Sequence, residues 1–410
     1  MKILLVRYRG WSEDWPLGQL ADDGRDILFE YSEQALHRGL ELSPLTLPLR
    51  PQAYGDFPRH LFRLPGLIAD SLPDGWGLLL MDRYFRKLGL DPAAISPLDR
   101  LALVGERGMG ALTFTPATPL EFPEKPPTLL GLASEVDEVI EGNDGEVLKH
   151  LLLLGGSAHG ARPKALVGYC STKKTVSTQP QGDHLPYLIK FPAEREHKEV
   201  CAIEQAYCET ARACGIDVPP TRYFELDRTH SAFGSERFDI ENGLRVPTHT
   251  LAGALHADFR VPAVDYISLL RATRALANDE REVAKAYQRA VFNILFNNRD
   301  DHSRNLAFRL GRDRRWRLAP AYDLTFSSGP GGEHQMDVCG EARRIRSDHL
   351  RELAAKGGIR AKVASSCLQR LLGELDAFER RLRNAPIRRS TVRDIVTAVK
   401  TNASALQDDS

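Results

Sequence analysis

The chain has 410 residues, 42% of them hydrophobic, so it is long enough to bury a large core and to form two or three domains. Lysine and arginine together number 55, as do aspartate and glutamate, and this balance gives no sign of a nucleic-acid or membrane partner. The six cysteines form no C-x-x-C pair, no apolar run reaches membrane-spanning length, and the apolar start is too short for a signal peptide. We therefore expect a soluble protein of the cytoplasm.

The first 128 residues are predicted to form a small α/β part of the chain. A turn is expected at residues 21–24, and the sequence Leu-Pro-Asp-Gly at 72–75 precedes a helix that stops at Gly89. Five prolines within residues 115–128 predict a linker. Strands are expected over residues 3–6, 26–31 and 108–114, and helices over 80–88 and 97–103.

A glycine-rich stretch follows a helix that is expected over residues 135–154. It reads Gly-Gly-Ser-Ala-His-Gly-Ala-Arg-Pro-Lys over residues 155–164, and its glycines would let backbone N–H groups approach phosphates. It is not a Walker A loop, because its second glycine is not followed by Lys and Ser or Thr. Since such a stretch before a strand is often only a turn, the motif alone does not decide between the two interpretations.

Two paired strands are predicted next, over residues 165–169 and 187–191, with a polar connection between them. Lys190 is the only charge in its short apolar strand, so it points either into a cleft or, as an ordinary strand lysine, into water. The helix predicted over 199–215 carries Glu204. A strand lysine followed by a helical glutamate is how protein kinases orient the lysine on the phosphates of ATP.

Further strands are predicted before the chain becomes helical at about residue 250. They cover residues 223–226 and 232–238, and the second would serve as a hinge where backbone groups near Glu236 and Phe238 meet an adenine edge. The later helices are expected over residues 264–277, 279–296, 348–355, 361–384 and 390–405.

The most informative stretch begins where the apolar helix ends at Phe296. A polar loop carries Asp300, His302 and Asn305, a hairpin with strands over 306–310 and 316–318 follows, and Asp323 comes just after it. Carboxylate and amide oxygens suit Mg²⁺, and a further carboxylate can accept the proton of an attacking hydroxyl.

Protein kinases place an aspartate base, an asparagine five residues later and a metal-binding aspartate in this order. A single D-x-x-x-x-N is common by chance, and the alternative is a loop whose Asp and Asn satisfy the backbone. Asp301, which follows Asp300, is a second candidate for the base. His302 is either a phosphate contact or a hydrogen-bonding loop residue.

Taken together and in order, the motifs resemble those of the HipA-type toxin kinases, the serine/threonine kinases of two-gene toxin–antitoxin modules. The resemblance covers nearly the whole chain. The motifs that carry it lie at residues 72–75, 155–164, 188–190, 236–239, 298–305 and 318–323.

The resemblance implies a role for each site residue. Asp300 would be the catalytic base, with His302 as a further catalytic residue, and Asn305 and Asp323 would be the Mg²⁺ ligands. ATP would be bound by the 155–164 loop, by Lys190 and Asp323, and by Glu236 and Phe238 at the adenine. Within that loop the binding residues would be Ser157, Ala158, His159 and Gly160, and Ser157 would also be the site of autophosphorylation.

The resemblance also implies an α+β fold of the two-lobed, protein-kinase-like class. The predicted parts are an N-terminal α/β subdomain over residues 1–128, an ATP-binding lobe over 129–248 and a helical lobe with the catalytic loop over 249–410. The substrate would be a cellular protein, such as an aminoacyl-tRNA synthetase. Because no helix-turn-helix is evident in the sequence, contact with DNA would be indirect, through a helix-turn-helix antitoxin partner.

Three alternatives belong to other classes. The first is a kinase of the same fold that acts on a small molecule or RNA. The second is a non-catalytic binding module, against which the presence of Lys190, Asp300, Asn305 and Asp323 argues. The third is a regulator that binds DNA directly, against which the neutral net charge argues.

Overall fold

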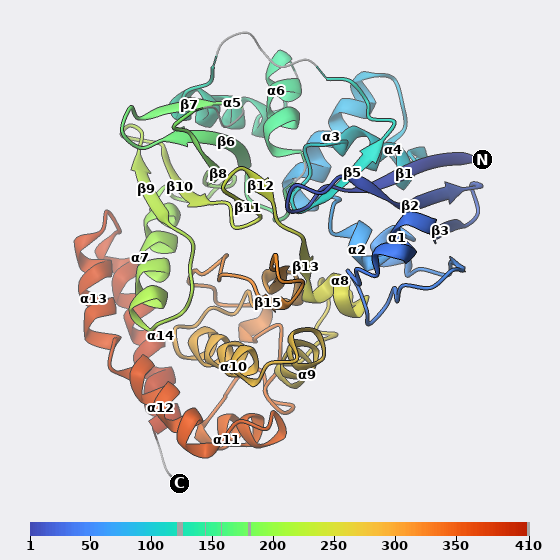
Figure 1. Cartoon of the computed structure of the whole chain (residues 1–410). Helices are drawn as coiled ribbons and strands as arrows, with labels where there is room; N and C mark the ends of the chain where they lie inside the picture. The colour runs from blue at the N-terminus through green and yellow to red at the C-terminus, as the bar shows by residue number, and fades with distance from the viewer. Residues whose placement is uncertain (121–125, 144, 157, 179–181, 408–410) are drawn as a thin grey trace. The chain divides into compact units, whose positions relative to one another are not determined.

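The computed structural model of the protein describes residues 1–120, 126–143, 145–156, 158–178 and 182–407. Helices and strands are labelled in chain order in Figure 1. The chain forms two compact units. Unit 1 comprises residues 1–201 and 220–249, and unit 2 comprises residues 202–219 and 250–410. The division into three parts at residues 128 and 248 stays a prediction.

The first sheet of unit 1 has five antiparallel strands in the order β4-β3-β2-β1-β5. Buried and exposed residues alternate along β3, so one face of the sheet packs into the core. The prediction that the turn at residues 21–24 joins the strands over 3–6 and 26–31 directly is wrong, because β2 lies between the two strands and the turn follows β2. Pro16 and Gly18 of β2 weaken the strand pattern in the sequence. The strands are β1 (Lys2–Tyr8), β2 (Trp15–Asp22), β3 (Ile27–Tyr31), β4 (Ala53–Tyr54) and β5 (Leu112–Thr115).

Six α-helices of unit 1 precede its second sheet. The single helix predicted over residues 135–154 is wrong: the chain forms two helices, because Gly142 takes a left-handed φ of 93° that ends the first of them. The helices are α1 (Glu33–Arg38), α2 (Gly66–Ala69), α3 (Gly75–Lys87), α4 (Pro97–Val104), α5 (Leu129–Ile140) and α6 (Glu146–Gly155), with short 3₁₀ turns η1 (Arg59–Leu61) and η2 (Pro92–Ala94).

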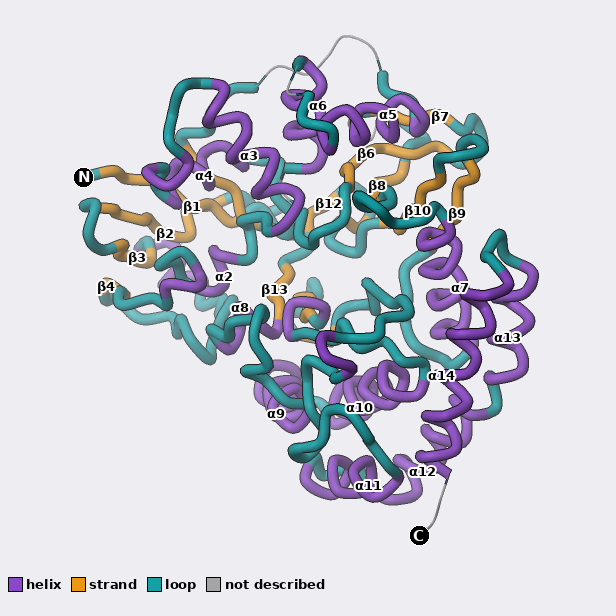
Figure 2. The backbone as a smooth tube through the Cα atoms, turned by 180° about the vertical axis from the view of Figure 1, so that it is seen from behind, coloured by secondary structure: helices purple, strands orange, loops and turns teal. Residues whose placement is uncertain are grey.

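The second sheet of unit 1 has the order β7-β6-β8-β10-β9, again antiparallel. The predicted pairing of the strands near residues 165 and 187 is confirmed, and the polar connection between them contains the additional short strand β7. Helices α5 and α6 pack on this sheet (Figure 2). The strands are β6 (Lys164–Cys170), β7 (Thr175–Ser177), β8 (Leu185–Lys190), β9 (Thr221–Glu225) and β10 (Ser231–Glu236), followed by β11 (Ile240–Glu241), β12 (Leu244–Arg245) and β13 (Thr248–Thr250).

Unit 2 is mostly helical and is built around α10, which packs against α9, α12 and α14. The single helix predicted over residues 361–384 is wrong, because the chain turns at Gly373 and Glu374 between α12 and α13. The hairpin predicted with strands over residues 306–310 and 316–318 is confirmed. The elements are α7 (Glu199–Ala213), α8 (Leu251–Leu255), α9 (Tyr266–Ala277), α10 (Glu280–Leu295), η3 (Ser303–Asn305), β14 (Ala307–Leu310), β15 (Trp316–Leu318), η4 (Pro330–Gly332), α11 (Ser347–Lys356), α12 (Ala361–Leu372), α13 (Leu375–Asn384) and α14 (Arg389–Gln407).

The C-terminal end of α10 is held by side chains from two other helices. The last carbonyls of a helix have no partner within it and need one from outside. The amide of Asn402 on α14 donates to the carbonyl of Ile294 at 3.0 Å, and the hydroxyl of Tyr207 on α7 donates to that of Phe296 at 2.6 Å. The loop that leaves α10 therefore starts from a fixed point.

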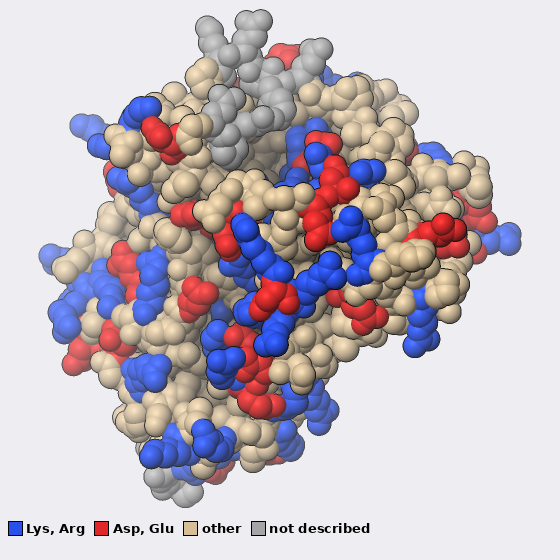
Figure 3. All heavy atoms as spheres, viewed as in Figure 1, with Lys and Arg blue, Asp and Glu red and all other residues tan. Residues whose placement is uncertain are grey.

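Charged side chains of both signs are interspersed on the face shown in Figure 3, in keeping with the balanced net charge. Among the helices of the described residues, none combines the length and the apolar composition that a membrane crossing requires.

Candidate functional site

The loop that follows α10 leaves the helix through a left-handed residue. Asn297 has a φ of 56°, a conformation that asparagine tolerates better than most residues. The next side chain, that of Asn298, is buried and donates from Nδ2 to Oδ1 of Asn293 at 3.0 Å and to the carbonyl of Asp323 at 3.4 Å. Asn298 therefore joins the end of α10 to the residue that follows the hairpin.

Hydrogen bonds tie together the backbone segments that carry Asp300, Asn305 and Asp323. Nδ2 of Asn305 donates to the backbone carbonyl of Asp300 at 2.8 Å, and the hydroxyl of Tyr322 donates to the carbonyl of Arg304 at 2.8 Å. Asp323 itself has a φ of 53°. A left-handed non-glycine residue costs conformational energy and persists only where its surroundings fix it, which is common at functional sites.

Asp300 presents its carboxylate to solvent. The side chain is 50% exposed, and its Oδ1 accepts a hydrogen bond from Nε2 of Gln335 at 3.3 Å. Nε2 of His302 lies 3.8 Å from the same oxygen. A carboxylate with this exposure can reach a substrate hydroxyl.

Asp301 is in the opposite situation, because its side chain is fully buried. Oδ2 accepts from the hydroxyl of Tyr266 at 2.6 Å and from Nδ1 of His334 at 2.7 Å, and Oδ1 accepts from the backbone N–H of Gln335 at 2.8 Å. Burial, reinforced by the nearby Asp301 charge, raises the pKa of Tyr266 well above its ordinary value, so its hydroxyl stays a donor. Three donors occupy the carboxylate, which leaves it little capacity to accept a substrate proton.

His302 lies beside the ring of Phe259, with the two ring centroids 5.3 Å apart. Its Nδ1 is buried and has no hydrogen-bond partner within the described residues. Nδ1 therefore makes none of the loop hydrogen bonds that one interpretation of His302 predicts.

In unit 1, Lys190 is buried, with 7% of its surface exposed, so the alternative of a strand lysine in water is wrong. It lies on β8 directly opposite Lys164 of β6, which is 2% exposed, and opposite Phe233 of β10. Residues directly opposite in an antiparallel pair share one face of the sheet, where like charges destabilise each other. Two buried ammonium groups on one face call for negative charge nearby.

Lys164 was not among the site residues predicted from the sequence. Its ammonium donates to the carbonyl of His159 in the glycine-rich stretch. Lys164 is recognised from the register of β6 against β8, which places it opposite Lys190. The sequence alone does not give this register.

The glycine-rich stretch is clamped by the Leu-Pro-Asp-Gly turn. Nε2 of His159 lies 3.0 Å from the carbonyl of Leu72, the N–H of Gly160 donates to the carboxylate of Asp74, and the N–H of Trp76 donates to the carbonyl of Gly160 at 3.2 Å. This turn is one of the motifs that carry the family resemblance, but the sequence predicts no role for it.

Close backbone contact explains the glycine of that turn. A Cβ on Gly75 would lie 2.6 Å from the Cα of Ala161, closer than any side chain allows. Ala158 is fully buried, and Ser157 lies outside the described residues.

The expected hinge residues stand at and just beyond the end of β10. Glu236 and Phe238 are both partly exposed, and burial raises the pKa of the Glu236 carboxyl. Between them, Arg237 pairs with the buried Asp239 at 2.7 Å, and Asp239 also accepts the N–H of Gly110 at 2.8 Å. Although burial acts to raise the pKa of Asp239, this partner and the hydrogen bonds hold it below its ordinary value.

A second constellation in unit 1 has the composition of a hydrolase triad. Oγ of Ser43 lies 3.0 Å from Nε2 of His249, and Nδ1 of His249 lies 2.7 Å from Oδ2 of Asp70. Both Ser43 and His249 are only 1% exposed, and Oγ of Ser43 also pairs with Thr46 at 3.1 Å. A nucleophile must reach its substrate, so we assign this group a structural role.

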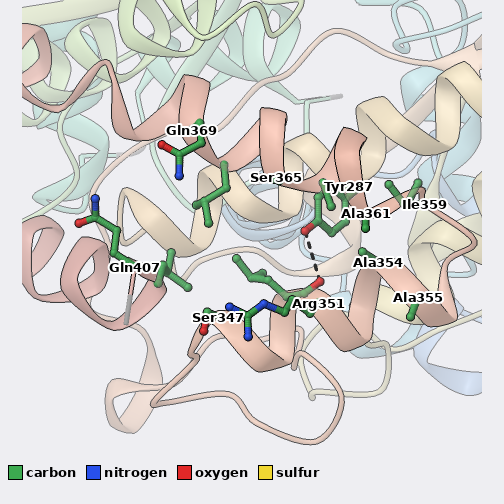
Figure 4. Close-up of a pocket in the computed structure, with 14 residues that line it drawn as sticks. Tyr287, Ser347, Arg351, Ala354, Ala355, Ile359, Ala361, Ser365, Gln369 and Gln407 are labelled. Carbon is green, nitrogen blue, oxygen red and sulfur yellow. Dashed lines mark hydrogen bonds between the residues drawn. The ribbon is translucent and has the colours of Figure 1, made fainter. Parts of the chain in front are cut away.

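A pocket of about 630 Å³ in unit 2 contains none of the predicted site residues. Residues of α11, α12 and α14 line it, together with Tyr287 of α10, whose hydroxyl donates to the carbonyl of Leu350 at 3.3 Å (Figure 4). The candidate site rests on the loop chemistry described above and not on this pocket.

Two family profiles match the chain in order. The profile described as the HipA N-terminal domain matches residues 9–115, and the one described as the HipA-like C-terminal domain matches residues 156–379, which is more than half of the chain. No curated protein matches the sequence significantly.

Two solved structures were compared with the chain. A HipA structure from Shewanella oneidensis MR-1, determined in a complex of HipA, HipB and operator DNA, is 19% identical, covers 98% of this chain and 96% of its own, and has a TM-score of 0.70. The Helicobacter pylori proinflammatory kinase CtkA is 12% identical, covers 55% of this chain and 86% of its own, and has a TM-score of only 0.42. The similarity to the Shewanella oneidensis MR-1 HipA structure confirms the predicted fold class, an α+β fold like that of HipA.

Replacing the buried carboxylate should destabilise the protein. Asp301→Ala leaves Tyr266, His334 and the Gln335 N–H without their acceptor, and breaking a buried charged pair costs about 3–5 kcal/mol. Asp300→Ala, at a half-exposed position, should stay within about 0.5 kcal/mol of the wild type. Urea unfolding of both variants measures the difference, and equal stability of the two would contradict the assignment of Asp301 as structural.

The clamp on the glycine-rich stretch predicts a local effect. Asp74→Ala removes one hydrogen bond to a charged acceptor, worth about 1.5 kcal/mol, so the Gly160 amide should exchange its hydrogen on the order of tenfold faster. Amide hydrogen exchange measures this, with Glu138→Ala on the exposed face of α5 as the control. Unchanged exchange at Gly160 would show that Asp74 does not hold the stretch.

Proposed function

The chain belongs to the HipA family, and from that premise we propose that it is an ATP- and Mg²⁺-dependent serine/threonine-protein kinase. The observation that carries the proposal is the half-exposed carboxylate of Asp300 in a loop whose backbone is tied to Asn305, while Asn298 of the same loop binds the backbone of Asp323. These groups are what phosphoryl transfer needs from unit 2: a base and two oxygen ligands for a metal.

Asp300 is proposed as the base, in preference to Asp301. A base must accept the proton of the attacking hydroxyl, so its carboxylate has to be reachable. Asp300 is half exposed, whereas three donors already occupy the buried carboxylate of Asp301. His302 would assist from beside Asp300, where its Nε2 already lies 3.8 Å from Oδ1.

Asn305 and Asp323 would hold Mg²⁺. Both offer hard oxygen atoms, which this ion prefers, and Mg²⁺ in kinases takes its remaining ligands from phosphate and water. Within the described residues no group of three or more His, Cys, Asp and Glu side chains is arranged to hold a metal. A site with one carboxylate and one carboxamide therefore depends on the phosphates of the nucleotide.

The buried lysines of unit 1 would bind the phosphates of ATP. Lys190 and Lys164 share one face of the sheet, and ammonium groups form strong charge-assisted hydrogen bonds to phosphate oxygens. The clamped stretch with Ala158, His159 and Gly160 would add backbone N–H groups. When bound, Mg²⁺–ATP supplies the phosphoryl group, and every other role falls to side chains and backbone of the chain.

Glu236 and Phe238 would contact the adenine, and Asp323 would contact the nucleotide as well as the metal. The Arg237–Asp239 pair would fix the backbone at this hinge. The guanidinium of Arg237 donates two hydrogen bonds to the carboxylate of Asp239, and such a paired contact holds both side chains in one orientation.

The partner proposed for this chain is an antitoxin that binds DNA. The Shewanella oneidensis MR-1 HipA structure was determined with HipB and its operator DNA. The charge of the present chain is balanced, and no helix-turn-helix was identified in its sequence, so we expect contact with DNA to be indirect. The proposed location is the cytoplasm, and the proposed substrate is a cellular protein whose phosphorylation halts growth.

Incubation of the pure protein with γ-labelled ATP and a cell lysate tests the proposed function directly. A labelled foreign protein band supports a protein kinase. Label in a small molecule or in RNA, without a protein band, would instead support a kinase of the same fold with another acceptor. No transfer under any condition would overturn the proposal.

Removing the base should stop the chemical step and leave binding intact. Asp300→Ala is expected to lower the rate of phosphoryl transfer by about 10²–10⁴-fold, because a positioned base is lost, while ATP still binds. Single-turnover transfer and equilibrium ATP binding measure the two effects. Asp313→Ala, an exposed aspartate of the hairpin turn, is the control and should transfer normally; near-normal transfer by Asp300→Ala would reject it as the base.

Removing a metal ligand should weaken nucleotide binding only when Mg²⁺ is present. Asp323→Asn keeps a side chain that tolerates the left-handed backbone, so it removes charge without removing the turn. We expect at least about tenfold weaker binding of ATP with Mg²⁺ and little change in EDTA, and the same direction for Asn305→Ala. Calorimetry in both conditions measures this, and equal losses would indicate a structural defect.

Ser157 is proposed as an autophosphorylation site that silences the enzyme. Phosphate adds about −1.5 to −2 charge and would repel the phosphates of ATP. Mass spectrometry of ATP-treated protein should find phosphate on Ser157 in the wild type and none in Asp300→Ala. An unmodified Ser157 in an active sample would reject this mode of regulation.

A further inference from the structure

Three residues of the segment over 331–335 are hydrogen-bonded to the stretch over 299–301. Nη1 of Arg299 donates to the carbonyl of Gly332, and the side chain of His334 donates to Asp301 at 2.7 Å. The backbone N–H of Gln335 donates to Asp301 at 2.8 Å. We call residues 331–335 the return segment, because here the chain comes back to the loop it left at residue 305.

Gln335 is the residue of the return segment whose side chain contacts Asp300. Its neighbours His334 and Met336 are 4% and 1% exposed, so the backbone on either side is fixed in the core. From this fixed backbone the Gln335 side chain extends to Asp300, where Nε2 donates to Oδ1 at 3.3 Å.

A donor from a fixed backbone restricts where a half-exposed carboxylate can point. The χ angles of an aspartate in water populate several rotamers, and a hydrogen bond to one oxygen selects among them. An ionised carboxylate has about four acceptor positions, so the bond from Gln335 does not by itself prevent the carboxylate from accepting a bond from a substrate hydroxyl. Precise placement matters, because a base displaced by an ångström loses much of its effect.

We propose that Gln335 is a positioning residue that orients the carboxylate of Asp300, with the return segment as its support. This inference rests on the proposed kinase function and adds a residue that helps to set the direction of its base. Gln335 acts through Asp300 and has no chemical role of its own.

The test compares two substitutions of one side chain. Gln335→Met keeps the length and removes the donor, and Gln335→Glu puts a second carboxylate against Asp300. We expect kcat for phosphoryl transfer to fall by up to about 10²-fold in Gln335→Met and further in Gln335→Glu, with the KM for ATP unchanged. Gln369→Met, on the exposed surface of α12 in the same unit, is the matched control and should leave kcat unchanged.

Stability separates positioning from support of the fold. Urea unfolding of Gln335→Met should match that of the wild type, because the Gln335 backbone bond to Asp301 is kept. A normal kcat in Gln335→Met would overturn the proposal, and so would a fall in kcat that is matched by a rise in KM and a loss of stability.

Crystal structures of the wild type and Gln335→Met provide a readout that does not need activity. We expect one Asp300 rotamer in the wild type and a different or mixed rotamer in the variant. If the wild type transfers no phosphoryl group, the proposed function fails, and the rotamers still decide whether Gln335 orients Asp300. An identical Asp300 in both structures would overturn the inference by itself.

Discussion

The buried carboxylate of Asp301 is the constraint on which the candidate site of unit 2 depends. A buried charge is tolerated only when donors surround it, and the three donors to Asp301 come from α9 and from the return segment. The hydroxyl of Tyr266 also accepts from Nδ2 of Asn293, whose Oδ1 accepts from Asn298. One hydrogen-bond network thus runs from the return segment through α9 and α10 to Asn298, which binds the carbonyl of Asp323. Because this network fixes Asp301, the neighbouring Asp300 can be exposed and still have a defined position.

In unit 1 the strand register places two lysines side by side. Lys164 and Lys190 stand opposite each other on adjacent strands and are both buried. The ammonium of Lys164 donates to the carbonyl of His159, which links it to the glycine-rich stretch. All seven residues of β6 are buried, so the packing of this strand fixes where the Lys164 side chain begins. Under the proposed function, the two ammonium groups would bind the phosphates of ATP.

Much of the fold could be predicted because the strongest signals are local. The hairpin strands near residues 306 and 316 and the helix that ends near Phe296 follow from periodicity and turn residues, and the structure confirms them. The errors occurred where a glycine breaks a pattern, as at Gly142, or where Pro16 and Gly18 weaken a real strand. The order of Asp300, Asn305 and Asp323 is visible in the sequence, but Gln335, His334 and Asp74 are not, because their roles depend on contacts between distant segments.

Burial decides which of the polar constellations can do chemistry. Ser43, His249 and Asp70 have the distances of a catalytic triad, yet their serine and histidine are closed to any substrate. Asp301 and His334 form an equally good pair and are equally buried, so they too belong to the framework. The side chain of Asp300 is 50% exposed, so its carboxylate is accessible, unlike the buried carboxylate of Asp301. In this chain the buried groups hold the structure, and the proposed base is the half-exposed carboxylate beside them.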